Sequence, residues 1–207
     1  MYAMNKQKKP TGIATPIQIS STGIHREIVK FPHEKAEIEL LIATAFCSGK
    51  PTLNPHISKY GFFSELELQT ENSIDFKVCT KEGFRWLELA EFAPLNHFNG
   101  KYENIPPTWS LEFMKDVFLS LIKKKNTKNY GDRVILLIYK THDALFIPPP
   151  LIRYIRSELI SSPPSFESIY FISTHSEEHT AVWQVWPDDV KDTGPMASTG
   201  TLHVGFD

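Results

Sequence analysis

The strongest constraint on the fold is a pair of short alternating segments joined by a polar turn. Apolar and charged residues alternate in residues 74–78 and again in residues 86–91, which is the pattern of two half-buried strands. A tight, even-numbered turn around residues 81–82 would join these strands into a hairpin and place Asp75 directly opposite Glu88. A slip of one residue would bring a carboxylate against the apolar row, so the pattern itself favours this acidic pair.

The same register makes further predictions about the two faces of the hairpin. On the apolar face, Phe76 should meet Leu87 and Ile74 should meet Leu89. On the other face, two opposed carboxylates repel each other unless a positive charge lies between them. A divalent metal ion is the natural candidate, because hard divalent cations prefer carboxylate oxygens.

Length and composition restrict the classes of protein to which the chain can belong. Its 207 residues suffice for one domain with a substantial core. Hydrophobic residues form 41% and charged residues 22% of the chain, a balance typical of globular proteins rather than of disordered ones. No apolar run approaches the roughly 20 residues needed to span a bilayer, so we expect no membrane partner.

The N-terminal segment and the cysteines indicate the cellular compartment. The first ten residues contain basic side chains but no apolar core behind them, which is unlike a signal peptide, so we expect a cytoplasmic protein. Cys47 and Cys79 are too few for a disulfide framework or a zinc knuckle. A reducing compartment suits both thiols.

Periodicity and turn residues divide the chain into one domain and two tails. Residues 1–16 and 188–207 are expected to be flexible, whereas residues 17–187 form a single domain. The predicted order is helix, three strands, helix, strand, helix, strand, strand, which indicates an α/β fold with a central mixed β-sheet flanked by helices. Residues 134–139, apolar throughout, predict a central strand. Further strands are expected at residues 62–69, 166–172 and 181–186, and helices from about residues 32, 110 and 150.

The first predicted helix carries several glutamates. On a helical wheel Glu34 projects near the middle of the apolar face, while Glu37 and Glu39 lie at its flanks. A glutamate in that central position needs a partner. Alternatively, the first turn is frayed and Glu34 only complements the helix dipole. The apolar face is expected to consist of Ile38, Leu41, Ile42 and Ala45.

This arrangement resembles the PD-(D/E)XK nuclease-like superfamily. The shared features are a helix with an inward glutamate, a strand entering with aspartate, a neighbouring strand with glutamate, and a helix that leads into a buried strand. The resemblance spans roughly residues 32–186 and implies a restriction-endonuclease-like core that hydrolyses nucleic acid, with DNA the expected substrate. It implies that Asp75 and Glu88 bind Mg²⁺ or Mn²⁺, and that Glu34, or less well Glu37, is the helix glutamate.

The family's lysine, two residues after the strand glutamate, is replaced here by Ala90. Some members of the superfamily carry this lysine on another element. Two candidates remain in this chain: Lys77, which shares a face with Asp75, and Lys125, which extends the inner side of the following helix. We favour Lys125 as the catalytic lysine.

A basic run follows that helix. Residues 123–128 carry four lysines, of which Lys124, Lys125 and Lys128 continue the inward side and are expected to contact phosphates. Lys123 points outward. The formal net charge of −2 gives no global attraction to nucleic acid, and cations also favour helix C-termini, so a solvated helix end is the alternative.

Other interpretations of these residues remain open. Asp75 and Glu88 could be solvent-facing carboxylates with Lys77 as their cross-strand ion-pair partner. The domain could also be a catalytically inactive binding or assembly module of the same fold, which Ala90 favours. His175 and His179 have the spacing of zinc ligands on a helix, but no third ligand lies nearby in sequence, so we interpret them as loop histidines.

The last predicted strand contains two tryptophans. Trp183 and Trp186 are three positions apart, which places them on opposite faces of a regular strand. One of them should therefore be exposed. A symmetric homodimer through this edge of the sheet is one consequence that we consider.

Overall fold

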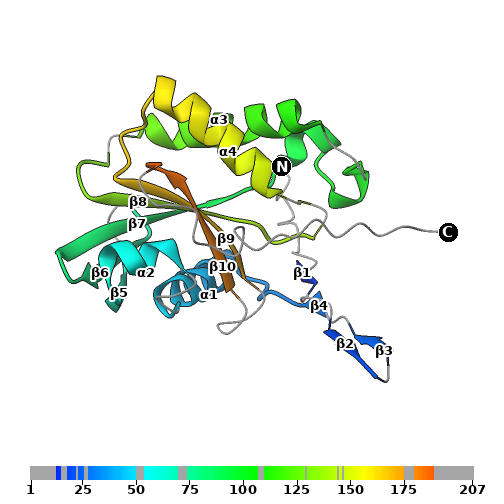
Figure 1. The fold of residues 1–207 in the computed structure, drawn as a ribbon, viewed down its shortest axis with the longest axis horizontal. Helices are drawn as coiled ribbons and strands as arrows, with labels where there is room; N and C mark the ends of the chain where they lie inside the picture. Colours follow the sequence, from blue (N-terminus) through cyan, green and yellow to red (C-terminus); the bar gives the residue numbers. More distant parts are fainter. Residues whose placement is uncertain are drawn as a thin grey trace, which may run out of the picture.

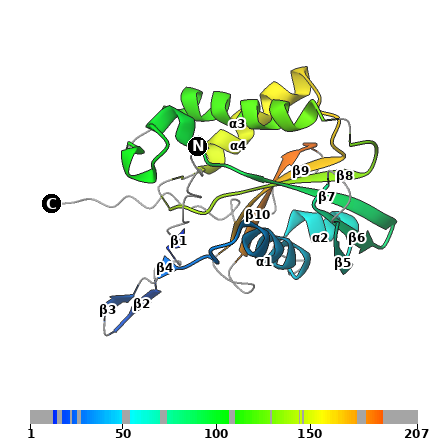
Figure 2. The ribbon, with the colours of Figure 1, turned by 180° about the vertical axis from the view of Figure 1, so that it is seen from behind.

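The computed structural model describes residues 13–14, 18–21, 23–25, 28–49, 54–69, 74–106, 110–128, 130–143, 145, 147–174 and 180–188. Its centre is a six-stranded β-sheet with helices on both faces (Figure 1). Helices α1 and α2 cover one face, and α3 and α4 cover the other, as the view from behind also shows (Figure 2). None of the described helices is both long and apolar enough to cross a membrane.

The sheet is mixed, as the order of elements predicts. Its strands follow the order β10-β9-β8-β7-β6-β5. The three strands β5, β6 and β7 form an antiparallel meander, β8 runs parallel to both β7 and β9, and β10 is antiparallel to β9. The bounds are β5 Ser64–Leu68, β6 Phe76–Thr80, β7 Gly83–Glu91, β8 Val134–Tyr139, β9 Ser168–Thr174 and β10 Thr180–Trp186.

The helices begin where their capping residues favour them. Ser110 precedes α3, and its hydroxyl accepts a hydrogen bond from the N–H of Phe113 at 3.1 Å. Proline occupies the first turn of α4, where its missing N–H has no cost. The bounds are α1 Lys35–Cys47, α2 Pro55–Tyr60, α3 Leu111–Asn126 and α4 Pro149–Ser161, with 3-10 turns η1 Leu95–Phe98 and η2 Tyr102–Asn104 between β7 and α3.

Two short strand pairs precede α1 outside the main sheet (Figure 1). Strand β1 (Ile13–Ala14) pairs with β4 (Ile28–Val29), and β2 (Gln18–Ser20) pairs with β3 (Gly23–His25). Strand β1 lies inside the expected tail of residues 1–16 and pairs with β4 inside the expected domain, and the division into one domain and two flexible tails stays a prediction. The rest of that tail, and residues 189–207, lie outside the described residues.

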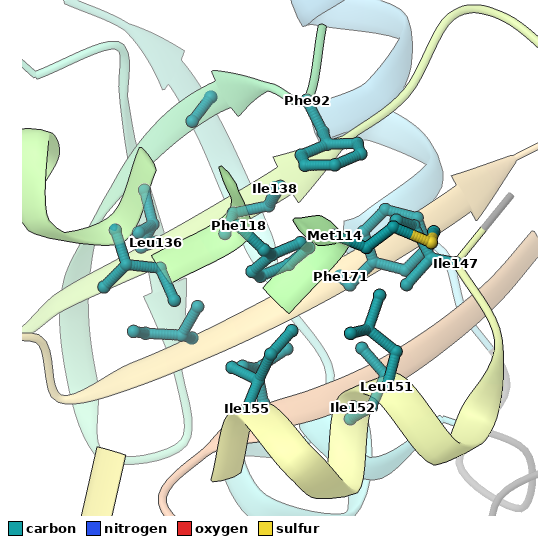
Figure 3. Close-up of a cluster of buried hydrophobic side chains, with 14 of the residues drawn as sticks. Phe92, Met114, Phe118, Leu136, Ile138, Ile147, Leu151, Ile152, Ile155 and Phe171 are labelled. Atoms are coloured by element: carbon teal, nitrogen blue, oxygen red, sulfur yellow. The ribbon is translucent and has the colours of Figure 1, made fainter. Parts of the chain in front are cut away.

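The sheet separates two apolar cores. The core under α3 and α4 includes Phe92, Phe118, Leu136, Ile155 and Phe171 (Figure 3). The opposite core, under α1, includes Ile42, Phe46, Leu87, Leu89 and Leu137. Strand β8 contributes to both and is buried throughout, as its apolar run predicts. Because Leu87 and Leu89 face α1, the residue between them, Glu88, projects toward α3.

The prediction that Trp183 and Trp186 lie on opposite faces is wrong. Both are half-buried and pack against the core under α3 and α4. The pairing of β10 with β9 shifts by one residue between Gln184 and Trp186, and a bulge of this kind changes the alternation of side chains. The exposure that suggested a dimer through this edge is therefore not observed, and the homodimer stays a prediction.

Candidate active site

The β6–β7 hairpin forms in the predicted register. Phe76 pairs with Leu87, and a two-residue turn at residues 81–82 joins the strands. Asp75 directly precedes the last pair of this ladder and Glu88 directly follows it, so no backbone pair joins the two acids. They nevertheless lie close enough at the end of the hairpin for the charge of Glu88 to raise the pKa of Asp75.

The predicted pairing of Ile74 with Leu89 does not form. Strand β6 begins only at Phe76, and the N–H of Leu89 donates to Asp75 Oδ2 at 2.7 Å. The carboxylate thus takes the place of a backbone acceptor where the ladder ends, while Ile74 joins the core under α3. This hydrogen bond holds Asp75 beside β7 and leaves Oδ1 without a hydrogen bond to the described residues.

Glu88 is a buried carboxylate with one satisfied and one unsatisfied oxygen. Its side chain is 2% exposed. Oε1 accepts hydrogen bonds from Lys125 Nζ and from the hydroxyl of Tyr130, each at 2.6 Å. Oε2 is buried and has no hydrogen-bond partner among the described residues. Since nearly all buried polar atoms in proteins are satisfied, such an oxygen indicates an additional partner, such as water or an ion.

Of the two candidate lysines, the fold brings Lys125 to the acids. Its ammonium bonds both Glu88 Oε1 and the carbonyl of Leu89, the latter at 2.8 Å. Lys77 instead forms an ion pair with Glu67 on β5, with Nζ and Oε2 3.2 Å apart. The interpretation of Lys77 as the partner of the acidic pair is therefore wrong, because the neighbouring strand offers it a nearer carboxylate.

The helix glutamate at this site is Glu39. Glu34, expected to face inward, is exposed at the N-terminal end of α1, and Glu37 is also exposed. The expected apolar face was misplaced: Leu41 is 38% exposed, whereas Phe46 is fully buried. Because successive residues turn by about 100°, this difference rotates the buried face of α1 away from Glu34 and toward Glu39. A helical wheel whose apolar face includes Phe46 predicts that Glu39, rather than Glu34, lies beside the buried face.

Glu39 forms part of an electrostatic cluster. It pairs with Lys35 one turn earlier on α1, with Nζ and Oε1 3.1 Å apart. Burial raises the pKa of Glu39, with a contribution from Asp75, and this outweighs the opposing effect of Lys35. Burial lowers the pKa of Lys35, but its bond to Glu39 and the charges of Asp75 and Glu88 together raise it. Three carboxylates therefore lie near two ammonium groups, Lys35 and Lys125, and the fully ionised cluster has one more negative than positive charge.

The same cluster affects Asp75 and Tyr130. Burial raises the pKa of Asp75, and the charge of Glu88 adds to this increase, while the Leu89 N–H opposes it. Burial and then the bond to Glu88 raise the pKa of Tyr130. The hydroxyl of Tyr130 is therefore fixed as a hydrogen-bond donor to Glu88 rather than as a phenolate.

A cleft of about 1130 Å³ reaches Lys35, the ion-pair partner of Glu39, but Asp75, Glu88 and Glu39 are not among its lining residues. It is bounded by the N-terminal part of α1, the segment after β7 and one side of α3. Lys35 and Tyr139 line the cleft, and the charge of Asp75 contributes to the raised pKa of each. Of the lysines expected to contact phosphates, Lys124 lines the cleft, whereas Lys128 lies over the ring of Tyr130, 5.7 Å from its centre. His175 and His179 lie outside the described residues.

In the described part of the chain, no three or more His, Cys, Asp or Glu side chains are arranged to hold a metal ion. Mg²⁺ usually keeps several waters and binds through one or two carboxylates plus substrate phosphates. Among the described residues, Glu88 Oε2 is buried without a hydrogen-bond partner and Asp75 Oδ1 accepts no hydrogen bond, so these two oxygens are the ones that could contribute to such a site.

Comparison with known proteins adds no family assignment. No protein-family model matches the chain, and no curated protein or solved structure shows a significant match to it.

Proposed function

We propose that this protein is a metal-dependent phosphodiesterase that hydrolyses nucleic acid, with DNA as the expected substrate and a core of the restriction-endonuclease-like type. One observation carries the proposal. The buried carboxylate of Glu88 is held by Lys125 and Tyr130 through one oxygen, while its other oxygen has no hydrogen-bond partner in the described part of the chain and lies in a cluster with Asp75 and Glu39. Such an oxygen is suited to a divalent cation.

Glu88 Oε2 and Asp75 Oδ1 would hold Mg²⁺ or Mn²⁺. A bound ion supplies a Lewis acid that activates water and neutralises charge developing on the phosphate in the transition state. Tyr130 and the Leu89 N–H each fix one acid, so that the remaining oxygens keep their orientation before substrate arrives. Such preorganisation is a main source of catalytic rate enhancement.

Lys125 would act as the cationic group for the substrate. Two of its three N–H bonds go to Glu88 and to the carbonyl of Leu89, which leaves one for a phosphate oxygen or for water. The ammonium approaches from α3, so it supplies from a helix the charge that Ala90 does not supply from β7. We infer that Glu39 adjusts the charge of the site through Lys35 and Asp75.

The second candidate function is a catalytically inactive module that binds nucleic acid or a partner protein. It is favoured by the ion pair itself, because Lys125 already neutralises Glu88 without a metal. In this case the acids and the lysine only stabilise the end of the hairpin. The free thiols of Cys47 and Cys79 accord with a cytoplasmic location for either function.

The test is plasmid nicking in the presence of Mg²⁺ or Mn²⁺, combined with calorimetric titration of the metal. We expect the wild type to bind metal and nick DNA, and Glu88→Gln to lose both. Glu67→Gln is the matched control, since Glu67 is an exposed strand glutamate that pairs with a lysine outside the site. If the wild-type protein neither binds metal nor nicks DNA, the phosphodiesterase is excluded and the inactive module remains as the proposed function.

A further inference from the structure

The cleft that reaches Lys35 is lined by charged and aromatic side chains. We propose that this cleft binds an unpaired strand, so that the polymer recognised is single-stranded rather than duplex. The inference rests on the proposed function for the identity of the polymer. It is carried by the charge, the rings and the size of the cleft.

The cleft is lined by two lysines, Lys35 and Lys124, and by two acids, Glu91 and Asp116, and Lys35 is paired with Glu39. Lys124 has no ion-pair partner among the described residues, and Lys35 lies at the end nearer the acidic cluster. Of the lining acids, Asp116 pairs with Lys115 at 3.4 Å. Glu91 accepts hydrogen bonds from two neighbouring hydroxyl groups. A phosphate backbone that follows the cleft would therefore meet uncompensated positive charge at Lys124.

Rings form part of the wall. Phe113 and His97 both line the cleft and meet edge to face, with ring centres 5.3 Å apart. Tyr102, also on the wall, stacks on His142 at 4.4 Å and donates its hydroxyl hydrogen to Glu91. Rings held in this way stack on bases whose faces are free. In a duplex those faces are covered by neighbouring base pairs, so only an unpaired strand or a flipped base reaches such rings.

The cleft is large enough for a stretch of a strand. Its volume of about 1130 Å³ lies at the upper end of the range of sites for one drug-sized ligand, about 300–1,000 Å³. It extends from Lys35, which is electrostatically coupled to Asp75 and Glu88, to Lys124 on α3. A strand in the cleft would therefore lie against Lys35, the residue that connects the cleft electrostatically to the proposed reaction site.

The test is fluorescence anisotropy with a labelled single-stranded DNA oligonucleotide and with the same oligonucleotide annealed to its complement. EDTA is present, so that binding is measured without cleavage. We expect tighter binding of the single strand. Lys124→Glu should weaken that binding about tenfold and lower its salt dependence by about one phosphate contact. Lys123→Glu is the matched control, because Lys123 is an exposed neighbour on the same helix that does not line the cleft, and it should change binding less than twofold.

The ring contribution is tested separately. Phe113→Leu keeps an apolar side chain but removes the stacking surface, and we expect about tenfold weaker binding of the single strand. Phe84→Leu, at an exposed ring outside the cleft wall, should have no effect. Equal losses in Lys123→Glu and Lys124→Glu, duplex binding as tight as single-strand binding, or no binding by the wild type would each overturn the inference.

Its failure can be distinguished from that of the proposed function. If the wild type nicks DNA but the two lysine variants bind single strands equally well, the phosphodiesterase proposal stands and the proposal of a single-strand cleft is wrong. If single-strand binding depends on Lys124 but the protein neither binds metal nor cleaves DNA, the proposal of a single-strand cleft stands and the phosphodiesterase proposal is wrong.

Discussion

Lys125 Nζ and Glu88 Oε1 lie 2.6 Å apart, joining the last turn of α3 to the middle of β7 across 37 residues of sequence. The carboxylate is almost completely buried and the lysine side chain is 20% exposed. Removal of one partner from a buried pair leaves an uncompensated charge, which destabilises proteins strongly. This ion pair therefore has consequences for stability that can be measured without reference to activity.

The first prediction concerns the loss of this lysine. Lys125→Met should lower the free energy of unfolding at neutral pH by about 3 kcal/mol, because Glu88 stays buried without its cation. Urea denaturation followed by circular dichroism measures the change. Lys123→Met, on the exposed side of the same helix, should change it by less than about 0.5 kcal/mol. Equal effects of the two substitutions would show that the pair contributes little to stability.

The second prediction concerns the pH dependence of Asp75. Burial, with a contribution from Glu88, raises its pKa in the folded state. A raised carboxyl pKa means that ionisation destabilises the folded state. This cost grows as the pH rises through the folded pKa and vanishes below the unfolded value of about 3.9. Asp75→Asn removes the cost, and its amide oxygen can still accept the Leu89 N–H.

We therefore expect Asp75→Asn to be more stable than the wild type at pH 7, and the difference to shrink as the pH falls toward about 4. Denaturation at a series of pH values measures it. Asp132→Asn, at an exposed position, should show no such trend. A variant that is less stable than the wild type at pH 7 would mean that the carboxylate is a net stabilising group.

The third prediction separates the two glutamates of α1. If the acidic cluster holds Mg²⁺, Glu39→Gln should weaken metal binding about tenfold, as the loss of outer-shell partners commonly does. Glu34→Gln should leave it unchanged, since Glu34 is exposed at the start of the helix. Calorimetric titration with Mg²⁺ measures both variants. Equal affinities would exclude Glu39 from the site.

The fourth prediction concerns the hydrogen bond from Tyr130 to Glu88. Tyr130→Phe should lower the free energy of unfolding by about 2 kcal/mol, because hydrogen bonds to charged groups are stronger than average and this acceptor is buried. Tyr154→Phe removes a similar bond, to Glu112, on the surface. Its effect should stay below about 0.5 kcal/mol. A similar loss in both variants would contradict the importance of burial at Glu88.

Local sequence patterns predicted much of the fold. The alternation in β6 and β7 predicted their pairing and its register, because a one-residue slip would move apolar side chains to the wrong face. The continuous apolar run predicted the central strand β8. The short helix α2 and the four strands before α1 were not predicted, since segments this short carry little periodic signal.

The candidate site was predicted less completely. The sequence favours Glu34 over Glu39 only if Leu41 belongs to the buried face of α1, and the structure leaves Leu41 exposed. Tyr130, in the loop after α3, was not assigned a role, because loop positions have no periodicity that indicates which way a side chain points. The preference for Lys125 over Lys77 agrees with the contacts of both residues.

The sequence by itself determined the strands of the main sheet and the register of the β6–β7 hairpin, since these follow from the two-residue period of a half-buried strand. Only the tertiary structure decided the partners of Asp75 and Glu88. The packing of α3 over the sheet brings Lys125 and Tyr130 to Glu88, and the rotation of α1 brings Glu39 toward Asp75. Such contacts depend on how whole helices dock on the sheet, and that is set by the complete apolar core rather than by any local pattern.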